Sequence, residues 1–144
     1  MEDAFLSTSI EGKQIIITGL SSELALESFK EYADKNIIYG TYNNNKINVK
    51  NKNIDISKLD LVNEKEIQEY IESIKKDLQK IILVNFAAYK FDGLVANYSV
   101  DEWDKTFDIN IKANFLLTKN LIPLMIANKW GRIIHISSAK ALRG

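Results

Sequence analysis

The turn after the first apolar segment carries residues that could meet a phosphate group. Residues 14–18 form a short β-branched run, and Gly19, Ser21 and Ser22 follow it directly, before a helical pattern. A glycine at such a strand-to-helix turn allows the backbone to approach a pyrophosphate at the N-terminus of the helix. The two serines are also good candidates to cap that helix. The pattern therefore predicts a place where a dinucleotide could bind.

Further polar residues lie in the last third of the chain. Asn110 falls inside an apolar helical pattern, where helix propensity explains an asparagine poorly. It could carry chemistry, or it could bond a neighbouring backbone group in the core, because buried polar groups are normally paired. Ser137 and Ser138 follow an apolar strand pattern at residues 133–136. His135, the one histidine, cannot form a metal site alone, and we expect a core or packing role for it.

The elements that must position these residues follow from the apolar patterns. Short apolar runs predict five strands, at residues 14–18, 37–42, 54–61, 80–84 and 133–136. Helical patterns predict a helix after Ser22, an amphipathic helix capped by Asn63, and a long helix at residues 99–128. Pro123 should kink or interrupt the long helix. Residues 43–53 are polar and rich in turn formers, which predicts a loop or small hairpin rather than a crossover helix.

The alternation of these elements predicts the fold class. Strands that alternate with helices indicate βαβ units and a parallel sheet. Right-handed crossovers then give a doubly wound α/β fold of the Rossmann type. We expect all 144 residues to form one domain, since a chain of this length can bury roughly 68–70% of its unfolded surface.

The composition excludes several kinds of site and partner. The formal net charge is +0, so no global field favours nucleic acid. Cysteine is absent, which excludes disulfides, thiolate metal sites and cysteine nucleophiles and fits a reducing compartment. No apolar run approaches the roughly 20 residues that span a bilayer, and the acidic N-terminus lacks the features of a signal peptide. We therefore expect a cytoplasmic protein that binds neither nucleic acid nor membrane and holds no metal.

The order of the motifs resembles that of the short-chain dehydrogenase/reductase family, roughly from Gly12 to Gly144. The segments that match in order are Thr18-Gly19, Asp60-Leu61, Asn85-Phe86-Ala87-Ala88, Phe107-Asp108-Ile109-Asn110 and Gly131-Arg132-Ile133-Ile134-His135-Ile136-Ser137-Ser138. The resemblance implies a parallel sheet with strand order 3-2-1-4-5, truncated after the fifth strand. It also implies hydride transfer between a nicotinamide cofactor and a small-molecule carbonyl or alcohol.

The resemblance implies a cofactor site at the ends of the first four strands. The residues that it assigns to NAD or NADP are Gly19, Ser21, Ser22, Leu24, Tyr42, Asn43, Asp60, Leu61, Asn85 and Ala87. In the family, an aspartate at the place of Asp60 contacts the adenine, although an aspartate at a helix-entry turn is an equally good account. Tyr42 and Asn43 carry no charge, so the sequence favours neither NAD nor NADP.

The first turn departs from the family pattern Thr-Gly-x-x-x-Gly-x-Gly. Glu23 and Ala25 stand where the second and third glycines would be. The methyl group of Ala25 could still fit between helix and strand, but Glu23 would bring negative charge and bulk to a site for an anion. Alternatively, Glu23 only favours the start of the helix through the helix dipole. We therefore expect weak or absent cofactor affinity.

The resemblance assigns two catalytic residues. Asn110 would hold a water of a proton relay, and Ser138 would hydrogen-bond the substrate carbonyl or hydroxyl. The family's Tyr-x-x-x-Lys motif, which moves the proton, does not follow Ser138 in this sequence. Tyr42 and Lys46 match its spacing, but they follow a strand and flank three asparagines, so the helical geometry is missing. We expect an oxidoreductase that is inactive as this chain stands; the alternative is a non-catalytic binding or interaction module.

Apolar surface predicts a homo-oligomer. The strand at residues 133–136 has no predicted neighbour on its outer side, and an open apolar edge is a template for another chain. The long helix at residues 99–128 carries more apolar side chains than one sheet face needs. In the family, the matching helix packs against a partner subunit.

Overall fold

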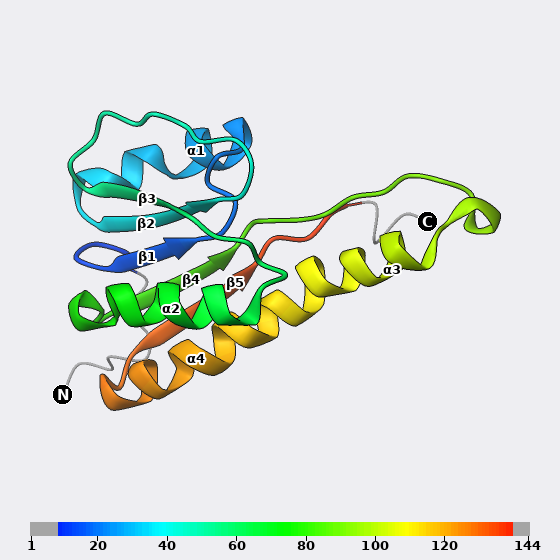
Figure 1. The fold of residues 1–144 in the computed structure, drawn as a ribbon. Coiled ribbons are helices and arrows are strands. Elements are labelled where there is room, and N and C mark those ends of the chain that lie inside the picture. Colours follow the sequence, from blue (N-terminus) through cyan, green and yellow to red (C-terminus); the bar gives the residue numbers. More distant parts are fainter. Residues whose placement is uncertain (1–8, 140–144) are drawn as a thin grey trace.

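The computed structural model describes residues 9–139 and has a parallel five-stranded sheet at its centre (Figure 1). The strands are β1 Gln14–Ile17, β2 Ile37–Tyr42, β3 Ile54–Lys58, β4 Ile81–Asn85 and β5 Gly131–His135. Their order in the sheet is β3-β2-β1-β4-β5, and every neighbouring pair is parallel. The predicted Rossmann-type arrangement is therefore confirmed.

Helices cover both faces of this sheet. α1 Glu23–Phe29 covers one face, and α2 Glu64–Ile74 and α4 Ala113–Ala127 cover the other. The fourth helix, α3 Val100–Phe107, contributes no buried residue. Short 3-10 turns occupy Lys30–Asp34, Lys75–Asp77 and Val95–Asn97. Figure 1 shows α3, and the loop that leads to it, extending beyond the carboxyl end of β4.

Side chains that alternate along the central strands build two separate cores. Ile16 and Leu83 belong to the core that α2 and α4 cover, whereas Ile15 and Ile82 belong to the core on the α1 side. All four are almost fully buried. Because successive residues of a strand point to opposite faces, a strand covered on both sides must be apolar throughout. This requirement explains the continuous apolar runs of β1 and β4.

The connection between β2 and β3 contains no helix. Residues 43–53 form an irregular loop beside α1 (Figure 1), as predicted. Val49 from this loop packs against the core on the α1 side. The loop therefore contributes one apolar contact where many α/β folds place a helix.

The third strand is shorter than predicted. It ends at Lys58, whereas the sequence predicted a strand through Leu61. Leu59 and Leu61 are buried in the core that α2 and α4 cover, so the chain leaves the sheet as it crosses to α2. The apolar residues of this buried connection resemble a strand in sequence, so the predicted strand ran past Lys58, where β3 ends.

The predicted long helix is divided at a different place from the one expected. A π-helical turn, Asp108–Lys112, separates α3 from α4, and α4 runs through Pro123. Pro123 and Lys119 are both exposed, so the Lys119 carbonyl, which lacks a donor from proline, can bond water instead. Of the predicted kink or interruption at Pro123, the interruption is therefore wrong.

The last strand lies at the edge of the sheet and is poorly covered. β5 pairs only with β4 in the sheet order, and Ile133, Ile134 and Ile136 are 36%, 42% and 49% exposed. These values are high for isoleucine next to a parallel sheet, whose faces are normally covered.

Candidate functional site

The turn after β1 and the loop after β4 are held together. The Thr18 Oγ1 accepts hydrogen bonds from the backbone N–H groups of Phe86 and Ala87, each at 3.1 Å. Gly19 has φ +70°, and a Cβ placed on it would lie 2.9 Å from the Ala87 Cα. Glycine alone adopts that φ without strain and allows that approach. The turn after β1 and the loop after β4 are therefore in direct contact at the carboxyl ends of these strands.

The start of α1 is closed by Ser22. The Ser22 Oγ accepts from the Ala25 N–H at 3.1 Å, which is an ordinary N-cap bond. Ala25 is fully buried in the core, so a methyl group does fit between this helix and the sheet. Glu23 is the first residue of α1 and is exposed.

A cavity of about 630 Å³ opens at the carboxyl ends of β1, β2, β3 and β4. Nine of the ten predicted cofactor-binding residues line it: Gly19, Ser21, Ser22, Leu24, Tyr42, Asn43, Asp60, Leu61 and Ala87. The residues of the lining that the sequence did not predict are Thr41, Asn44, Asn45, Leu59, Phe86, Ala88, Tyr89, Lys105 and Ile109. Glu23 is not among the described residues that line it.

Asn85, the tenth predicted residue, faces the neighbouring strand. It is 3% exposed, and its Nδ2 lies 3.1 Å from the Nδ1 of His135. Among the described residues, its Oδ1 has no hydrogen-bond partner. Asn85 therefore joins β4 to β5 through its side chain and does not line the cavity.

His135 does not lie in the core. Its side chain is exposed, because the edge strand β5 has little cover, and it contacts Asn85. Of the two expected roles, core or packing, the core role is therefore wrong. An amide Nδ2 can only donate, so in this contact the His135 Nδ1 is the acceptor.

Asn110 clamps the loop after β4 to the π-helical turn. Its Oδ1 accepts from the Tyr89 N–H, and its Nδ2 donates to the Tyr89 carbonyl, both at 2.8 Å. The carbonyl of Asn110 accepts from Asn114 Nδ2 at 2.7 Å. The backbone-bonding role that the sequence left open for Asn110 is therefore present.

The serines after β5 lie on an exposed surface. A second cavity, of about 490 Å³, is lined by Asn110, Ser137 and His135 together with residues of α4. Ser138 is exposed and is not among the described residues that line either cavity. The structure therefore brings Ser137, rather than Ser138, to the cavity beside Asn110.

Tyr89 is the centre of a polar cluster at the α3 side of the first cavity. Its hydroxyl donates to the Glu102 carboxylate, and the Lys105 Nζ lies 4.3 Å from the centroid of its ring. The hydrogen bond to Glu102 is the largest cause that raises the pKa of the Tyr89 phenol, and desolvation adds to it. No sequence signal marked this cluster, because its members lie on a loop and a helix with no common spacing.

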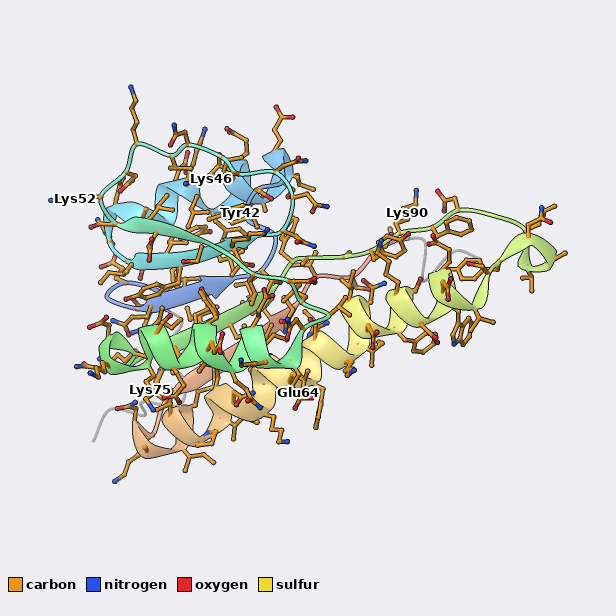
Figure 2. The ribbon with its side chains drawn as sticks, viewed as in Figure 1. Tyr42, Lys46, Lys52, Glu64, Lys75 and Lys90 are labelled. Atoms are coloured by element: carbon orange, nitrogen blue, oxygen red, sulfur yellow. The ribbon has the colours of Figure 1, made fainter. Side chains whose placement is uncertain are left out.

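Two features are absent from residues 9–139, a group of metal-binding side chains and a membrane-spanning helix. Within that range no three histidine, aspartate or glutamate side chains are grouped closely enough to hold a metal ion. Nor does any helix of the described part have the length and apolar character to cross a membrane. Tyr42 ends β2, and Figure 2 shows Lys46 on the irregular loop that follows it, so this pair does not share a helical face.

Comparison with known proteins identifies the family. The model of the short chain dehydrogenase family matches residues 13–144. The chain belongs to this family. Two similar relatives are named 3-oxoacyl-[acyl-carrier-protein] reductase FabG. The one from Aquifex aeolicus is 34% identical over 134 residues, which cover 92% of this chain and 48% of the relative.

The relative from Rickettsia felis is 33% identical over 141 residues, which cover 94% of this chain and 57% of the relative. This family member thus spans about half the length of the curated relatives it matches. Among solved structures, serine dehydrogenase from Escherichia coli aligns with a TM-score of 0.76 over 87% of this chain and 62% of that chain. At 23% identity this likeness supports the fold alone.

Proposed function

We propose that this chain forms the nicotinamide-dinucleotide site of an oxidoreductase that interconverts a carbonyl and an alcohol. The observation that carries the proposal is the cavity at the carboxyl ends of β1 to β4, lined by nine residues chosen from the family pattern. In open α/β sheets, ligands bind at this edge, next to the first strand-to-helix turn. A volume of about 630 Å³ falls within the range typical of ligand pockets.

The lining fits the parts of such a cofactor. Gly19 and the neighbouring Ser21 would leave the backbone open to the pyrophosphate, and Asp60 would meet the adenine. Tyr42 and Asn43 would lie at the ribose, where no charge selects NAD or NADP. When bound, the cofactor supplies the hydride.

Proton transfer is the step for which these residues are insufficient. The family resemblance gives it to a tyrosine and a lysine four residues apart on a helix, and Tyr42 and Lys46 do not have that geometry. We therefore expect cofactor binding without turnover from the 144-residue chain. Mixtures of this chain, cofactor and a panel of ketones and alcohols should give no change in cofactor absorbance.

We expect the cofactor to bind weakly, with a Kd of roughly 0.1–1 mM, about −4 to −5.5 kcal/mol. The N–H groups of Ser22 and Ala25 already bond Gly19 O and Ser22 Oγ, which leaves fewer donors for a phosphate. Glu23 adds a negative charge at the same helix end. Replacing Glu23 with glycine should therefore improve affinity by about threefold to tenfold.

Titration calorimetry with all four cofactor forms tests this expectation. Glu23→Gln separates charge from bulk, because it keeps the size of the side chain. Glu27→Gln is the matched control, since Glu27 is on the same helix but pairs with Lys30 at 2.6 Å. Low-micromolar binding by the unaltered chain would contradict the expectation.

A second candidate is a Rossmann-fold interaction module, with the exposed surface of α4 and β5 as its functional part. Ile111, Phe115 and Ile126 are 62%, 60% and 70% exposed along one helix and its π-helical start. Together with the isoleucines of β5 they make more apolar surface than isolated exposed residues would. We propose that a second copy of the chain covers this surface.

Self-association should therefore depend on α4. In sedimentation over a concentration series, the mass of the unaltered chain should rise with concentration, and Phe115→Asp should remain a monomer. Val62→Asp is the matched control, because Val62 is an exposed apolar residue on the loop before α2, 40% exposed. A monomeric unaltered chain at the highest concentration would refute this candidate.

A further inference from the structure

Lys105 is the one cationic residue among the described residues that line the cavity. Asp60 is the one anionic residue of the same lining. The Lys105 ammonium is held over the Tyr89 ring, 4.3 Å from its centroid. A lysine placed on an aromatic face is attracted to it and loses part of its hydration without losing its charge. The cavity therefore has a positioned positive charge on its α3 side.

Glu102 is one of two carboxylates of α3 at a pairing distance from Lys105 along the helix; the other is Asp101, four residues before Lys105. Glu102 and Lys105 are three residues apart on α3, a spacing at which opposite charges commonly pair. Between residues 9 and 139, however, the two form no ion pair; the Glu102 carboxylate accepts the hydrogen bond of the Tyr89 hydroxyl instead. Lys105 therefore keeps its charge available to the cavity.

The position of Tyr89 is fixed from the helix side. Asn110 bonds both the N–H and the carbonyl of Tyr89 at 2.8 Å, so the backbone at this point of the loop cannot drift from the π-helical turn. A tyrosine hydroxyl is protonated at neutral pH and can donate, and the hydrogen bond to Glu102 raises the pKa of this phenol further above its ordinary value. The contacts of Asn110 and Glu102 with Tyr89 thus keep the Glu102 carboxylate away from Lys105.

We propose that Lys105 is the residue that recognises the anionic group of the cavity's ligand, and that Tyr89 keeps it available by engaging Glu102. The inference rests on the proposed function, whose ligand carries a diphosphate. Neither residue belongs to the glycine turn, so this charge is supplied by α3 and not by α1. The positive charge of Lys105 would offset part of the phosphate affinity that the altered glycine turn lacks.

The first test compares adenosine with adenosine diphosphate, which differ only in the anionic group. NMR titration of the 144-residue chain at low salt should show that Lys105→Met weakens adenosine diphosphate binding about tenfold and leaves adenosine unchanged. Raising the salt should shrink the difference, because screening weakens the charge. Lys90→Met is the matched control and should change neither ligand, since Lys90 pairs with Asp92 on the exposed loop after β4 (Figure 2).

The second test removes only the hydroxyl of Tyr89. In Tyr89→Phe the ring remains, but Glu102 is released and can pair with Lys105, so adenosine diphosphate binding should weaken although Lys105 is intact. The double variant Tyr89→Phe with Glu102→Gln should restore it, because the carboxylate that Tyr89→Phe releases is then absent. A structural role for Tyr89 would predict the opposite, since the double variant removes more contacts.

Three outcomes decide the inference. An unchanged adenosine diphosphate affinity in Lys105→Met, with dinucleotides still bound by the unaltered chain, overturns it and leaves the proposed function standing. A double variant that binds no better than Tyr89→Phe overturns the role of Tyr89. Absence of binding by both adenosine diphosphate and the dinucleotides overturns the proposed function together with the inference.

Discussion

Replacing Asn110 with alanine should lower the free energy of unfolding by about 2–3 kcal/mol. Asn110 makes two hydrogen bonds to the backbone of Tyr89, both at 2.8 Å and both partly buried. Without the Asn110 side chain, the N–H and the carbonyl of Tyr89 lose these partners. Leaving such groups unpaired costs more free energy than the two hydrogen bonds contribute to stability. Urea unfolding of the two chains gives the difference directly.

Asn114→Ala is the matched control for this loss. Asn114 lies one turn further along and makes one bond, from its Nδ2 to the Asn110 carbonyl at 2.7 Å. Its replacement should cost about 0.5–1.5 kcal/mol. Equal losses for the two variants would mean that the clamp on the loop after β4 adds nothing beyond an ordinary side-chain bond.

Replacing Gly19 with alanine should cost about 3 kcal/mol and should reduce ligand binding as well. The φ of +70° is unfavourable for alanine, and the new Cβ would meet the Ala87 Cα at 2.9 Å. Either the turn after β1 or the loop after β4 must then move, and both line the cavity. Chemical denaturation measures the first effect and cofactor titration the second.

Gly12 provides the comparison that separates strain from contact. Gly12 has φ +66°, but a Cβ there would meet nothing within 4 Å. Gly12→Ala should therefore cost only about 1 kcal/mol, the penalty of a left-handed backbone, and should leave ligand binding unchanged. If the two alanine variants lost the same stability, the close approach to Ala87 would not be the reason for glycine at position 19.

The strands and their order could be predicted because the signals were local. β1 and β4 are buried on both faces and are therefore continuously apolar, which a sequence displays directly. Right-handed crossovers then leave few possible orders. The cavity followed from the same logic, since the turns after parallel strands meet at one edge.

The errors arose where packing overruled a local pattern. The third strand was predicted too long because Leu59 and Leu61 lie in a buried connection, and such a connection is as apolar as a strand. A core position was one of the two roles expected for His135 because it lies mid-strand, yet the edge strand leaves it exposed. Pro123 was expected to kink or interrupt a helix; α4 is not interrupted there, because an exposed position lets water replace the missing bond.

The polar cluster at Tyr89 could not have been found from sequence. Its contacts to Glu102 and Lys105 depend on the path of a loop that has no periodic pattern. Asn110 was recognised from the family motif, but its two bonds to Tyr89 depend on the π-helical turn, which no residue pattern predicted. Loop paths and helix irregularities of this kind are set by tertiary contacts.

The most direct test of the central claim is a map of where the cofactor binds. Backbone amide NMR of the chain with NAD⁺ and NADP⁺ gives this map. Each cofactor is added to about 10 mM, so that millimolar affinity is detected. We predict that the amides of residues 19–24, 42–45, 59–61 and 86–89 change, because these residues include most of the cavity lining. Changes confined to α4 and β5, or to the surface around Trp103 and Phe107 on α3, would contradict a dinucleotide site at the carboxyl ends of the strands, as would no change at all.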